Sequence, residues 1–311
     1  MPSLTHQALA WALPRLRRSR DLDSAGADSL AAERARIEAG HRSTAGDPMP
    51  TNAVTRFERR FVVSREEVPA AGGSFPAYVL AARGATPSRT VVYVHGGGYT
   101  AGIDPFHVRY VARLADRLGV RVVLPDYPLA PEHTWRDSHD ALVDLTASWV
   151  SRSPGGAVLA GDSAGGGLAL ALALSLRDRG LPQPDRLLLH APWVDLSTST
   201  PETEEYDAVD PWLFLGKLRA YAAWWAGSAA DLTRPEVSPA LGDLAGLPRA
   251  LVFQGTRDLL TPGTRLLARR AAEAGWDLTY VEEPGLLHVY PLLPLVPEAR
   301  RAWRRTEAFL R

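Results

Sequence analysis

Gly161-Asp162-Ser163-Ala164-Gly165-Gly166-Gly167 places a serine between glycines, directly after the short apolar stretch 157–160. The apolar stretch predicts a buried strand, and residues 164–177, rich in Ala and Leu, predict a buried helix. A G-x-S-x-G pattern between a strand and a helix is typical of a nucleophile elbow, a tight turn that presents the serine hydroxyl. Glycines two positions either side of the serine leave room for backbone where a side chain would clash. The stretch therefore predicts a strand–helix junction and a candidate nucleophile, Ser163.

Strands and helices alternate along most of the chain on both sides of this junction. Strand patterns fall at residues 57–63, 77–81, 91–94, 121–124, 157–160, 187–190, 250–254 and 277–281. Helix patterns fall at residues 106–118, 135–150, 164–177, 264–274 and 298–310. We expect the first two strands to pair antiparallel, and the later alternation predicts an α/β fold, a mostly parallel sheet with helices on both faces. In such sheets ligands bind at the carboxyl ends of the strands.

Two segments depart from the alternation. Residues 1–50 predict two helices, at 4–13 and 29–39, and a linker from residue 42. Residues 196–245 interrupt the strand–helix order and carry the aromatic residues Trp212, Phe214, Tyr221, Trp224 and Trp225. We expect this aromatic insertion to line a substrate pocket or to pack as ordinary helices.

Composition limits the classes of partner. The 311 residues suffice for one large α/β domain or two small ones, and 35 basic residues balance 35 acidic ones. This balance argues against nucleic acid or an anionic membrane as the main partner. The absence of cysteine excludes a thiolate nucleophile and cysteine-ligated metals. Residues 8–13 are too short an apolar stretch for a secretory signal, and no run approaches the roughly 20 residues of a membrane span. We expect a cytoplasmic protein without a stable membrane anchor.

A second glycine motif, His95-Gly96-Gly97-Gly98-Tyr99, follows the strand expected at 91–94. Gly96-x-Gly98-x-x-Ala101 also fits a dinucleotide-binding fingerprint, with Asp126 as the ribose-binding acid. That fingerprint requires a helix to begin at the glycines, whereas Gly102 and Pro105 intervene before a helix can start. Consecutive glycines instead favour an oxyanion hole, because several backbone N–H groups can point at one negative charge. In hydrolases with this elbow, the N–H after the nucleophile, here that of Ala164, completes the hole.

A serine hydroxyl needs a base and an orienting acid to act as a nucleophile, and here the expected chain order is Ser, Asp or Glu, His. Of the two later histidines, His190 ends a strand and is interpreted as structural. His288 follows the last strand through the expected loop 282–285, where an exposed, mobile base is expected. Asp258 follows the preceding strand and is the expected acid. Other acids are less well placed in the sequence, namely Asp195, Asp207, Asp210, Glu282 and Glu283.

No histidine spacing indicates a metal site, because the chain has no His-Glu-x-x-His and His133 and His139 lie six positions apart. We expect neither a metal nor a cofactor.

These motifs together resemble the hormone-sensitive lipase family of α/β-hydrolases over roughly residues 55–311. The resemblance rests on residues 93–99, 126–133 and 161–166, and on Ser238-Pro239, Leu247-Pro248, Asp258 and Glu273-Ala274-Gly275. It implies hydrolysis of short to medium acyl esters without a cofactor, through a triad of Ser163, Asp258 and His288. It places the oxyanion donors on the backbone of Gly97, Gly98 and Ala164.

The resemblance also implies a domain division and an assembly. A cap falls on residues 1–50 and 196–235, and the hydrolase core on 51–195 and 236–311. Tyr99, Trp212 and Phe214 are the predicted pocket residues. Family members often dimerise through the last strand and helix, so a homodimer is allowed.

The sequence departs from the family pattern at three places. The acid motif reads Asp258-Leu259-Leu260-Thr261-Pro262-Gly263 and keeps only its catalytic Asp, Pro128 stands where Arg is usual, and Val289-Tyr290-Pro291 follows the histidine. The last variant is similar to actinobacterial acetyl-hydrolases and lactone hydrolases of the family. An amidase, a deacetylase or a lactone hydrolase with the same triad therefore stays open. A ligand-binding receptor on this scaffold is the alternative from another class, and such receptors tend to lose the histidine that is present here.

Overall fold

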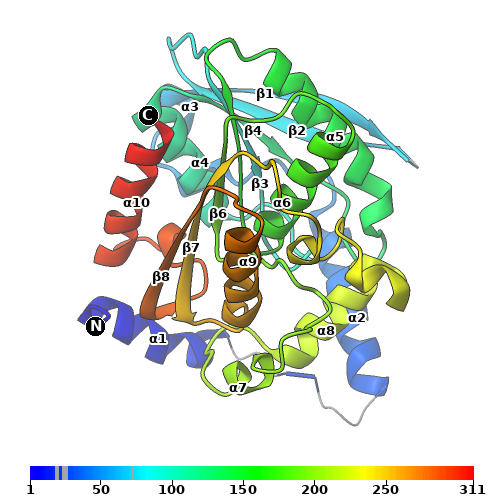
Figure 1. Cartoon of the computed structure of the whole chain (residues 1–311). Coiled ribbons are helices and arrows are strands. Elements are labelled where there is room, and N and C mark those ends of the chain that lie inside the picture. Colours follow the sequence, from blue (N-terminus) through cyan, green and yellow to red (C-terminus); the bar gives the residue numbers. More distant parts are fainter. Residues whose placement is uncertain (18–20, 23–26, 72) are drawn as a thin grey trace.

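The computed structural model describes residues 1–17, 21–22, 27–71 and 73–311, and eight strands within these ranges form one sheet (Figure 1). Residues 18–20 and 23–26 of the predicted N-terminal segment lie outside the described residues. The strands are β1 (Phe61–Ala70), β2 (Gly73–Ala82), β3 (Thr90–Val94), β4 (Arg121–Pro125), β5 (Ala157–Asp162), β6 (Arg186–His190), β7 (Arg249–Arg257) and β8 (Leu278–Leu287). Their order is β1-β2-β4-β3-β5-β6-β7-β8. β2 pairs antiparallel with β1 and β4, and the pairs from β4 to β8 are parallel, which confirms the predicted α/β fold.

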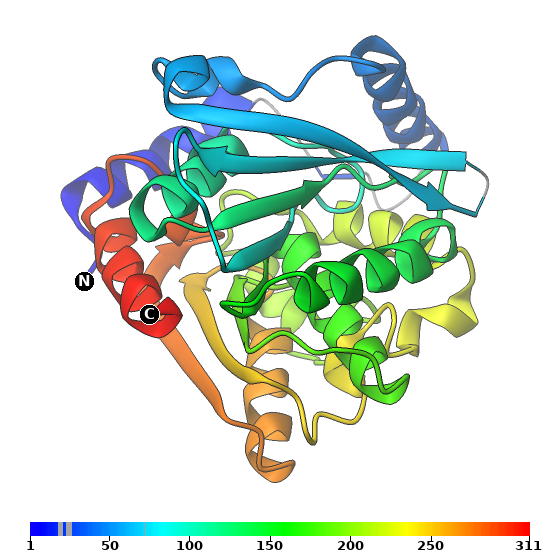
Figure 2. The ribbon, with the colours of Figure 1, turned by 90° about the horizontal axis from the view of Figure 1, so that it is seen from above.

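Helices cover both faces of this sheet (Figures 1 and 2). The helices are α1 (Leu4–Arg17), α2 (Ala27–Thr44), α3 (Phe57–Arg60), α4 (Pro105–Leu118), α5 (Trp135–Ser151), α6 (Ser163–Asp178), α7 (Thr203–Asp207), α8 (Leu215–Ala226), α9 (Thr261–Glu273) and α10 (Pro297–Leu310). Short 3-10 turns lie at Thr51–Ala53, Ala229–Thr233, Pro239–Leu241 and Tyr290–Leu292. α4 and α10 pack on one face, and α5, α6 and α9 on the other.

The central strands are apolar throughout because both of their faces are buried. Successive side chains of a strand point to opposite faces. Val91 and Tyr93 of β3 accordingly join the core with α4 and α10, whereas Val92 and Val94 join the core with α5 and α6. The ends of the strands are set by their direction: β3, β5, β6, β7 and β8 run parallel, so their carboxyl ends lie at the same edge of the sheet, where the candidate site is found.

The structure corrects two predicted element boundaries. Residues 57–60 form helix α3 rather than strand, after Arg56 in the left-handed region at φ 55°, and β1 begins only at Phe61. The expected loop 282–285 is part of β8. β8 is the last strand of the sheet, where a proline such as Pro284 is tolerated because the outer side of an edge strand has no partner.

Helices from the two segments predicted to form a cap gather at the lower end of the sheet in Figure 1, with α1, α7 and α8 along it and α2 beside α8. α1 continues past the predicted end at residue 13 to Arg17, with Pro14 in its last turn. The ion pair between Glu33 and Lys217, 3.2 Å, joins α2 to α8. Among the described residues, no helix is both long enough and apolar enough to span a membrane.

The elbow glycines allow close approach of backbone, which a methyl group would prevent. A Cβ on Gly165 would lie 2.2 Å from the carbonyl oxygens of Val94 and His95, whereas a Cβ on Gly40 in α2 would meet nothing within 4 Å. Gly165→Ala should therefore lower the free energy of unfolding by about 1–3 kcal/mol through overpacking. Gly40→Ala, the control, should leave it unchanged or raise it by up to about 1 kcal/mol. Urea denaturation measures both, and equal stability of the two variants would contradict this account.

Candidate active site

Ser163 occupies the turn between β5 and α6, as the sequence predicted. Its φ is 52°, in the left-handed region that non-glycine residues rarely adopt. The N–H of Trp193 donates to its carbonyl at 2.8 Å and helps to fix this backbone conformation. The strained turn raises the hydroxyl above the carboxyl end of β5, where the side chain is 9% exposed.

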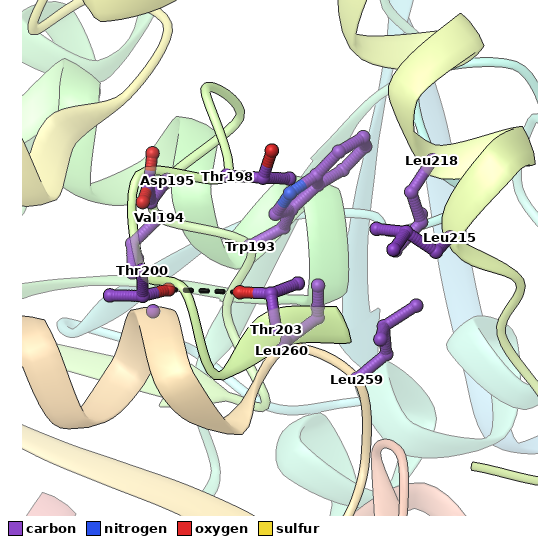
Figure 3. A pocket seen from close by; sticks show the side chains of 11 residues that line it. Trp193, Val194, Asp195, Thr198, Thr200, Thr203, Leu215, Leu218, Leu259 and Leu260 are labelled. Carbon is purple, nitrogen blue, oxygen red and sulfur yellow. Dashed lines mark hydrogen bonds between the residues drawn. The ribbon is translucent and has the colours of Figure 1, made fainter. Parts of the chain in front are cut away.

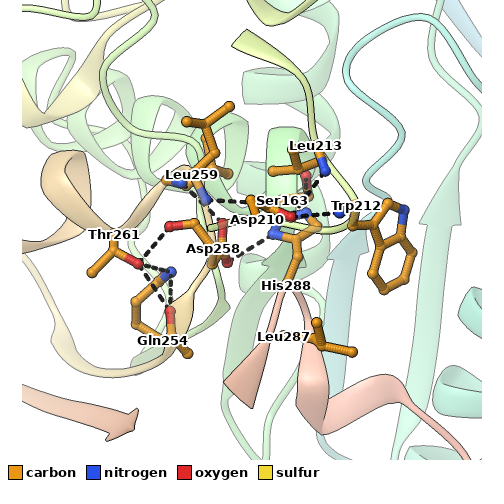
Figure 4. Close-up of polar contacts among 12 residues, drawn as sticks. Ser163, Asp210, Trp212, Leu213, Gln254, Asp258, Leu259, Thr261, Leu287 and His288 are labelled. Atoms are coloured by element: carbon orange, nitrogen blue, oxygen red, sulfur yellow. Dashed lines mark hydrogen bonds and ion pairs between the residues drawn. The ribbon is translucent and has the colours of Figure 1, made fainter. Parts of the chain in front are cut away.

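The structure brings Ser163, His288 and Asp258 together in one hydrogen-bonded series (Figure 4). His288 Nδ1 lies 2.9 Å from Asp258 Oδ2, and His288 Nε2 lies 2.9 Å from Ser163 Oγ. A carboxylate only accepts, so Nδ1–H donates to Asp258 and leaves the Nε2 lone pair to accept from the serine hydroxyl. This arrangement can transfer the serine proton to the imidazole. The three residues come from the ends of β5, β7 and β8, which are parallel strands.

The imidazole of His288 is enclosed rather than exposed and mobile, which corrects the expectation from the sequence. Only 4% of the residue is exposed, because β8 continues to Leu287 and leaves no long loop before it. His6 Nε2 of α1 accepts the N–H of Leu287 at 3.0 Å and anchors the chain just before the base. The rings of Trp212 and His288 are nearly perpendicular, and their centroids lie 5.8 Å apart.

Nearby carboxylates favour the charged form of His288. Burial lowers its pKa, but the charge of Asp258 and the hydrogen bond with it outweigh burial. The charges of Asp210 and Asp162 add to the effect, and the net pKa of His288 lies above its ordinary value. Because the carboxylates outweigh burial, the imidazole accepts a proton readily while it stays hydrogen-bonded to Asp258.

Residues 258–260, here called the acid loop, hold Asp258 through several bonds. The second carboxylate oxygen, Asp258 Oδ1, accepts the N–H of Leu260 at 2.9 Å, and Thr261 Oγ1 donates to the Asp258 carbonyl at 2.7 Å. Asp258 is fully buried, so its orientation is set by these bonds and by His288.

Asp210 also lies at this site, although its position in the sequence disfavoured it. Its Oδ2 accepts the N–H of Leu259 at 2.7 Å, and its Oδ1 accepts the N–H groups of Trp212 and Leu213 at 2.7 and 3.0 Å (Figure 4). The one local signal is the pair Asp210-Pro211, which is typical of a turn. Such a signal gives no indication of the partner 49 positions later in the chain.

Residues 95–99, here called the oxyanion loop, follow β3 in a glycine turn. Gly97 has φ 114° and Gly98 φ 63°, and a Cβ on Gly97 would lie 2.4 Å from the Ala101 carbonyl oxygen. The N–H groups of Thr100 and Ala101 donate back to the Gly97 carbonyl. Neither the Gly97 nor the Gly98 N–H donates to another residue in the part of the chain that the structure describes. The N–H of Ala164, in the first turn of α6, has no acceptor within its helix, so three donors remain available.

A dinucleotide fingerprint requires a helix that opens at its glycines. Helix α4 begins only at Pro105, nine residues after Gly96 and seven after Gly98, and Asp104 caps it. The dinucleotide interpretation is therefore wrong, because a helix N-terminus does not follow the glycine turn directly.

The buried carboxylate of Asp162 holds the oxyanion loop through a backbone N–H. Asp162 accepts from the Tyr93 hydroxyl at 2.7 Å and from the Gly96 N–H at 3.2 Å, and His107 Nε2 lies 3.4 Å away. Burial raises the pKa of Asp162, but the charge and hydrogen bond of His107 outweigh it and lower that pKa to about 2. Sequence reasoning missed this role of Asp162, which directly precedes Ser163.

The three predicted pocket residues have different surroundings. Tyr99 is 1% exposed and stacks on Trp225, with ring centroids 4.3 Å apart, so it packs in the core. Trp212 is half-buried against His288, and the Lys217 ammonium lies 5.7 Å from the ring of Phe214. A pocket beside the acid loop opens between the segment after β6, α8 and that loop (Figure 3). Its apolar walls include Trp193, Leu215, Leu218, Leu259 and Leu260.

The remaining histidines have structural contacts. His190 Nε2 lies 2.7 Å from the Tyr110 hydroxyl and is fully buried, which confirms its interpretation as structural. Within the described ranges, no group of three or more His, Asp or Glu side chains is placed to hold a metal ion.

Comparisons with known proteins agree with this geometry. Residues 91–292 match a family model described as alpha/beta hydrolase fold. An acetyl-hydrolase of Streptomyces hygroscopicus is 35% identical over 226 residues, which cover 72% of this chain and 75% of that protein. A carboxylesterase, NlhH, of Mycobacterium tuberculosis is 33% identical over 233 residues, covering 71% of this chain and 72% of that one.

Solved structures extend the likeness to the whole chain. The crystal structure of an esterase from the bacterial hormone-sensitive lipase family is 28% identical, with a TM-score of 0.78, and the match covers 100% of this chain and 99% of that one. A mutant of the esterase E40 is 27% identical, with a TM-score of 0.79, and the match covers 99% and 98% of the two chains. The chain belongs to the hormone-sensitive lipase family of α/β-hydrolases.

Proposed function

We propose that this chain is a serine esterase in which Ser163 is the nucleophile, His288 the general base and acid, and Asp258 the residue that orients the base. The observation that carries the proposal is the pair of 2.9 Å hydrogen bonds that join the three side chains through the two nitrogens of one imidazole. The names of the related proteins, acetyl-hydrolase and carboxylesterase, support an ester substrate. An intact His288 in this geometry favours catalysis over a ligand-binding role.

The proposed reaction proceeds in two halves. Ser163 Oγ attacks the ester carbonyl carbon while its proton moves to His288 Nε2, and the resulting oxyanion accepts the N–H groups of Gly97, Gly98 and Ala164. The tetrahedral intermediate then expels the alcohol, which takes the proton from Nε2 and leaves an acyl group on Ser163. A water molecule, deprotonated by His288, attacks the acyl carbon and releases the acid and the free serine.

The substrate proposal is an ester with a short to medium acyl chain. The enclosure of His288, which is 4% exposed with Trp212 beside it, supports a small acyl group. Tyr99 supports the oxyanion loop from the core side through its stacking on Trp225.

Replacing the nucleophile should abolish turnover without unfolding the chain. Ser163→Ala should lower kcat for p-nitrophenyl acetate by roughly a thousandfold or more, because the covalent step is lost. Ser151→Ala is the matched control and should keep wild-type kinetics, because this exposed serine donates to the Ala147 carbonyl within its own helix. Near-normal esterase activity of Ser163→Ala would refute the assignment of the nucleophile.

The pH dependence of kcat/KM should report the ionisation of His288. The base must be neutral to accept the serine proton, so activity is lost as the pH falls through its pKa. Because nearby carboxylates raise this pKa, the midpoint of the acid limb should lie above 6.5, the ordinary value for histidine. Initial rates with p-nitrophenyl acetate from pH 5 to pH 9 test this, and a midpoint below the ordinary value would argue against the proposed environment of the base.

The aromatic residues of the insertion should set acyl-chain preference. Trp212→Ala and Phe214→Ala should enlarge the space for the acyl group and shift the ratio of kcat/KM for p-nitrophenyl octanoate over acetate upward, by roughly tenfold for a few extra methylene groups. Trp11→Ala, at a tryptophan 64% exposed on α1, is the control. An unchanged profile in both insertion variants would mean that these residues only pack.

A further inference from the structure

A second buried carboxylate lies against the acid loop. Asp210, in the segment between α7 and α8, is 8% exposed and accepts three backbone N–H groups. Two of these, from Trp212 and Leu213, belong to its own turn and fix the carboxylate. The third is the N–H of Leu259, directly after Asp258, so Asp210 ties the insertion to the acid loop.

A second bond joins the same two segments on the other side of Asp258. Arg257 Nε donates to the Val209 carbonyl at 3.1 Å. The neighbours Val209 and Asp210 therefore hold Arg257 and Leu259, which flank Asp258 in the chain. The bond to Leu259 holds the backbone directly after Asp258, so the insertion restricts the direction in which Asp258 meets His288.

Asp210 also acts through its charge. The groups that face it are Asp258 from the end of β7, His288 from the end of β8, and the N–H dipoles of Leu259 and Leu213. Burial raises the pKa of Asp210 to about 6, and the charge of Asp258 contributes to the rise, while the N–H groups and His288 oppose it. Conversely, the charge of Asp210 is one of the causes that raise the pKa of His288. The negative charges of Asp258 and Asp210 thus both favour the protonated form of His288.

We propose that Asp210 is a positioning residue, which holds the acid loop through Leu259 and stabilises the protonated form of His288 with its negative charge. The inference rests on the proposed roles of Ser163, His288 and Asp258. The imidazolium forms when the serine proton moves to Nε2. A second carboxylate therefore stabilises the positive charge that develops on His288 in the transition state. Trp212, whose ring lies nearly perpendicular to that of His288, follows Asp210 by two residues, so the same turn also places Trp212.

The test uses a fluorophosphonate probe and the full chain. Ser163 Oγ attacks phosphorus, the P–O bond forms as the P–F bond breaks, fluoride leaves, and the serine proton moves to His288 Nε2. The labelling rate as a function of pH therefore follows the ionisation of His288 without requiring turnover of an ester. Asp210→Asn and Asp210→Ser both remove the charge, and the serine hydroxyl can still accept an N–H. Asp207→Asn is the matched control, because Asp207 lies in the same insertion and, among the described residues, its carboxylate accepts the N–H of Leu215 and has no contact with the acid loop.

Both neutral variants should be labelled roughly tenfold more slowly than wild type, because the negative charge that stabilises the imidazolium in the transition state is gone. Their acid-limb midpoint should move to lower pH, because the charge that favours the imidazolium is gone. With p-nitrophenyl acetate, kcat should fall while KM changes little, and Asp207→Asn should match wild type in every measurement. Circular dichroism checks that each variant is folded.

Three results would overturn the inference. Wild-type rates in the Asp210 variants would show that the carboxylate has no effect on the site. Slower labelling with an unchanged midpoint in folded variants would reduce Asp210 to a packing role. If wild type itself were not labelled, the roles proposed for Ser163 and His288 would fail, and the inference would fail with them.

Discussion

The His288 imidazole is the interaction on which the rest of the site depends. It joins a serine from the end of β5 to an aspartate from the end of β7 through hydrogen bonds of 2.9 Å on each nitrogen. Parallel strands place their carboxyl ends at one edge of the sheet, so side chains 125 and 30 positions from the histidine can meet there. The sheet order, with β5, β6, β7 and β8 adjacent, sets the distances that one imidazole can bridge.

Buried polar and charged groups hold this geometry from several sides. Asp162 fixes the oxyanion loop through the Gly96 N–H and is compensated by His107 and Tyr93. His6 fixes the backbone just before the base. Buried polar groups are costly unless they are hydrogen-bonded, so each of these contacts restricts the site to one arrangement. Both segments predicted to form a cap contact this site, residues 1–50 through His6 and residues 196–235 through Asp210.

The α/β fold, the elbow and the three residues of the hydrogen-bonded series could be predicted from the sequence because each has a local signal. Apolar runs between helices mark the buried strands, glycines mark the turn at Ser163, and Asp258 and His288 follow recognisable strands. Asp210 could not be found in this way, since its partner Leu259 is distant in the sequence and depends on how the insertion packs. The enclosure of His288 was also missed, because Pro284 and Gly285 indicate a loop, whereas pairing with β7 extends the edge strand to Leu287.

The most direct test of the account is to trap the covalent intermediate. The protein is mixed with p-nitrophenyl acetate, quenched in acid within milliseconds, digested and analysed by mass spectrometry. The account predicts one acetyl group on the peptide that contains Ser163, which disappears as the reaction is allowed to proceed. Release of p-nitrophenol with no acetyl group on Ser163, or with acetylation of a different residue, would contradict it.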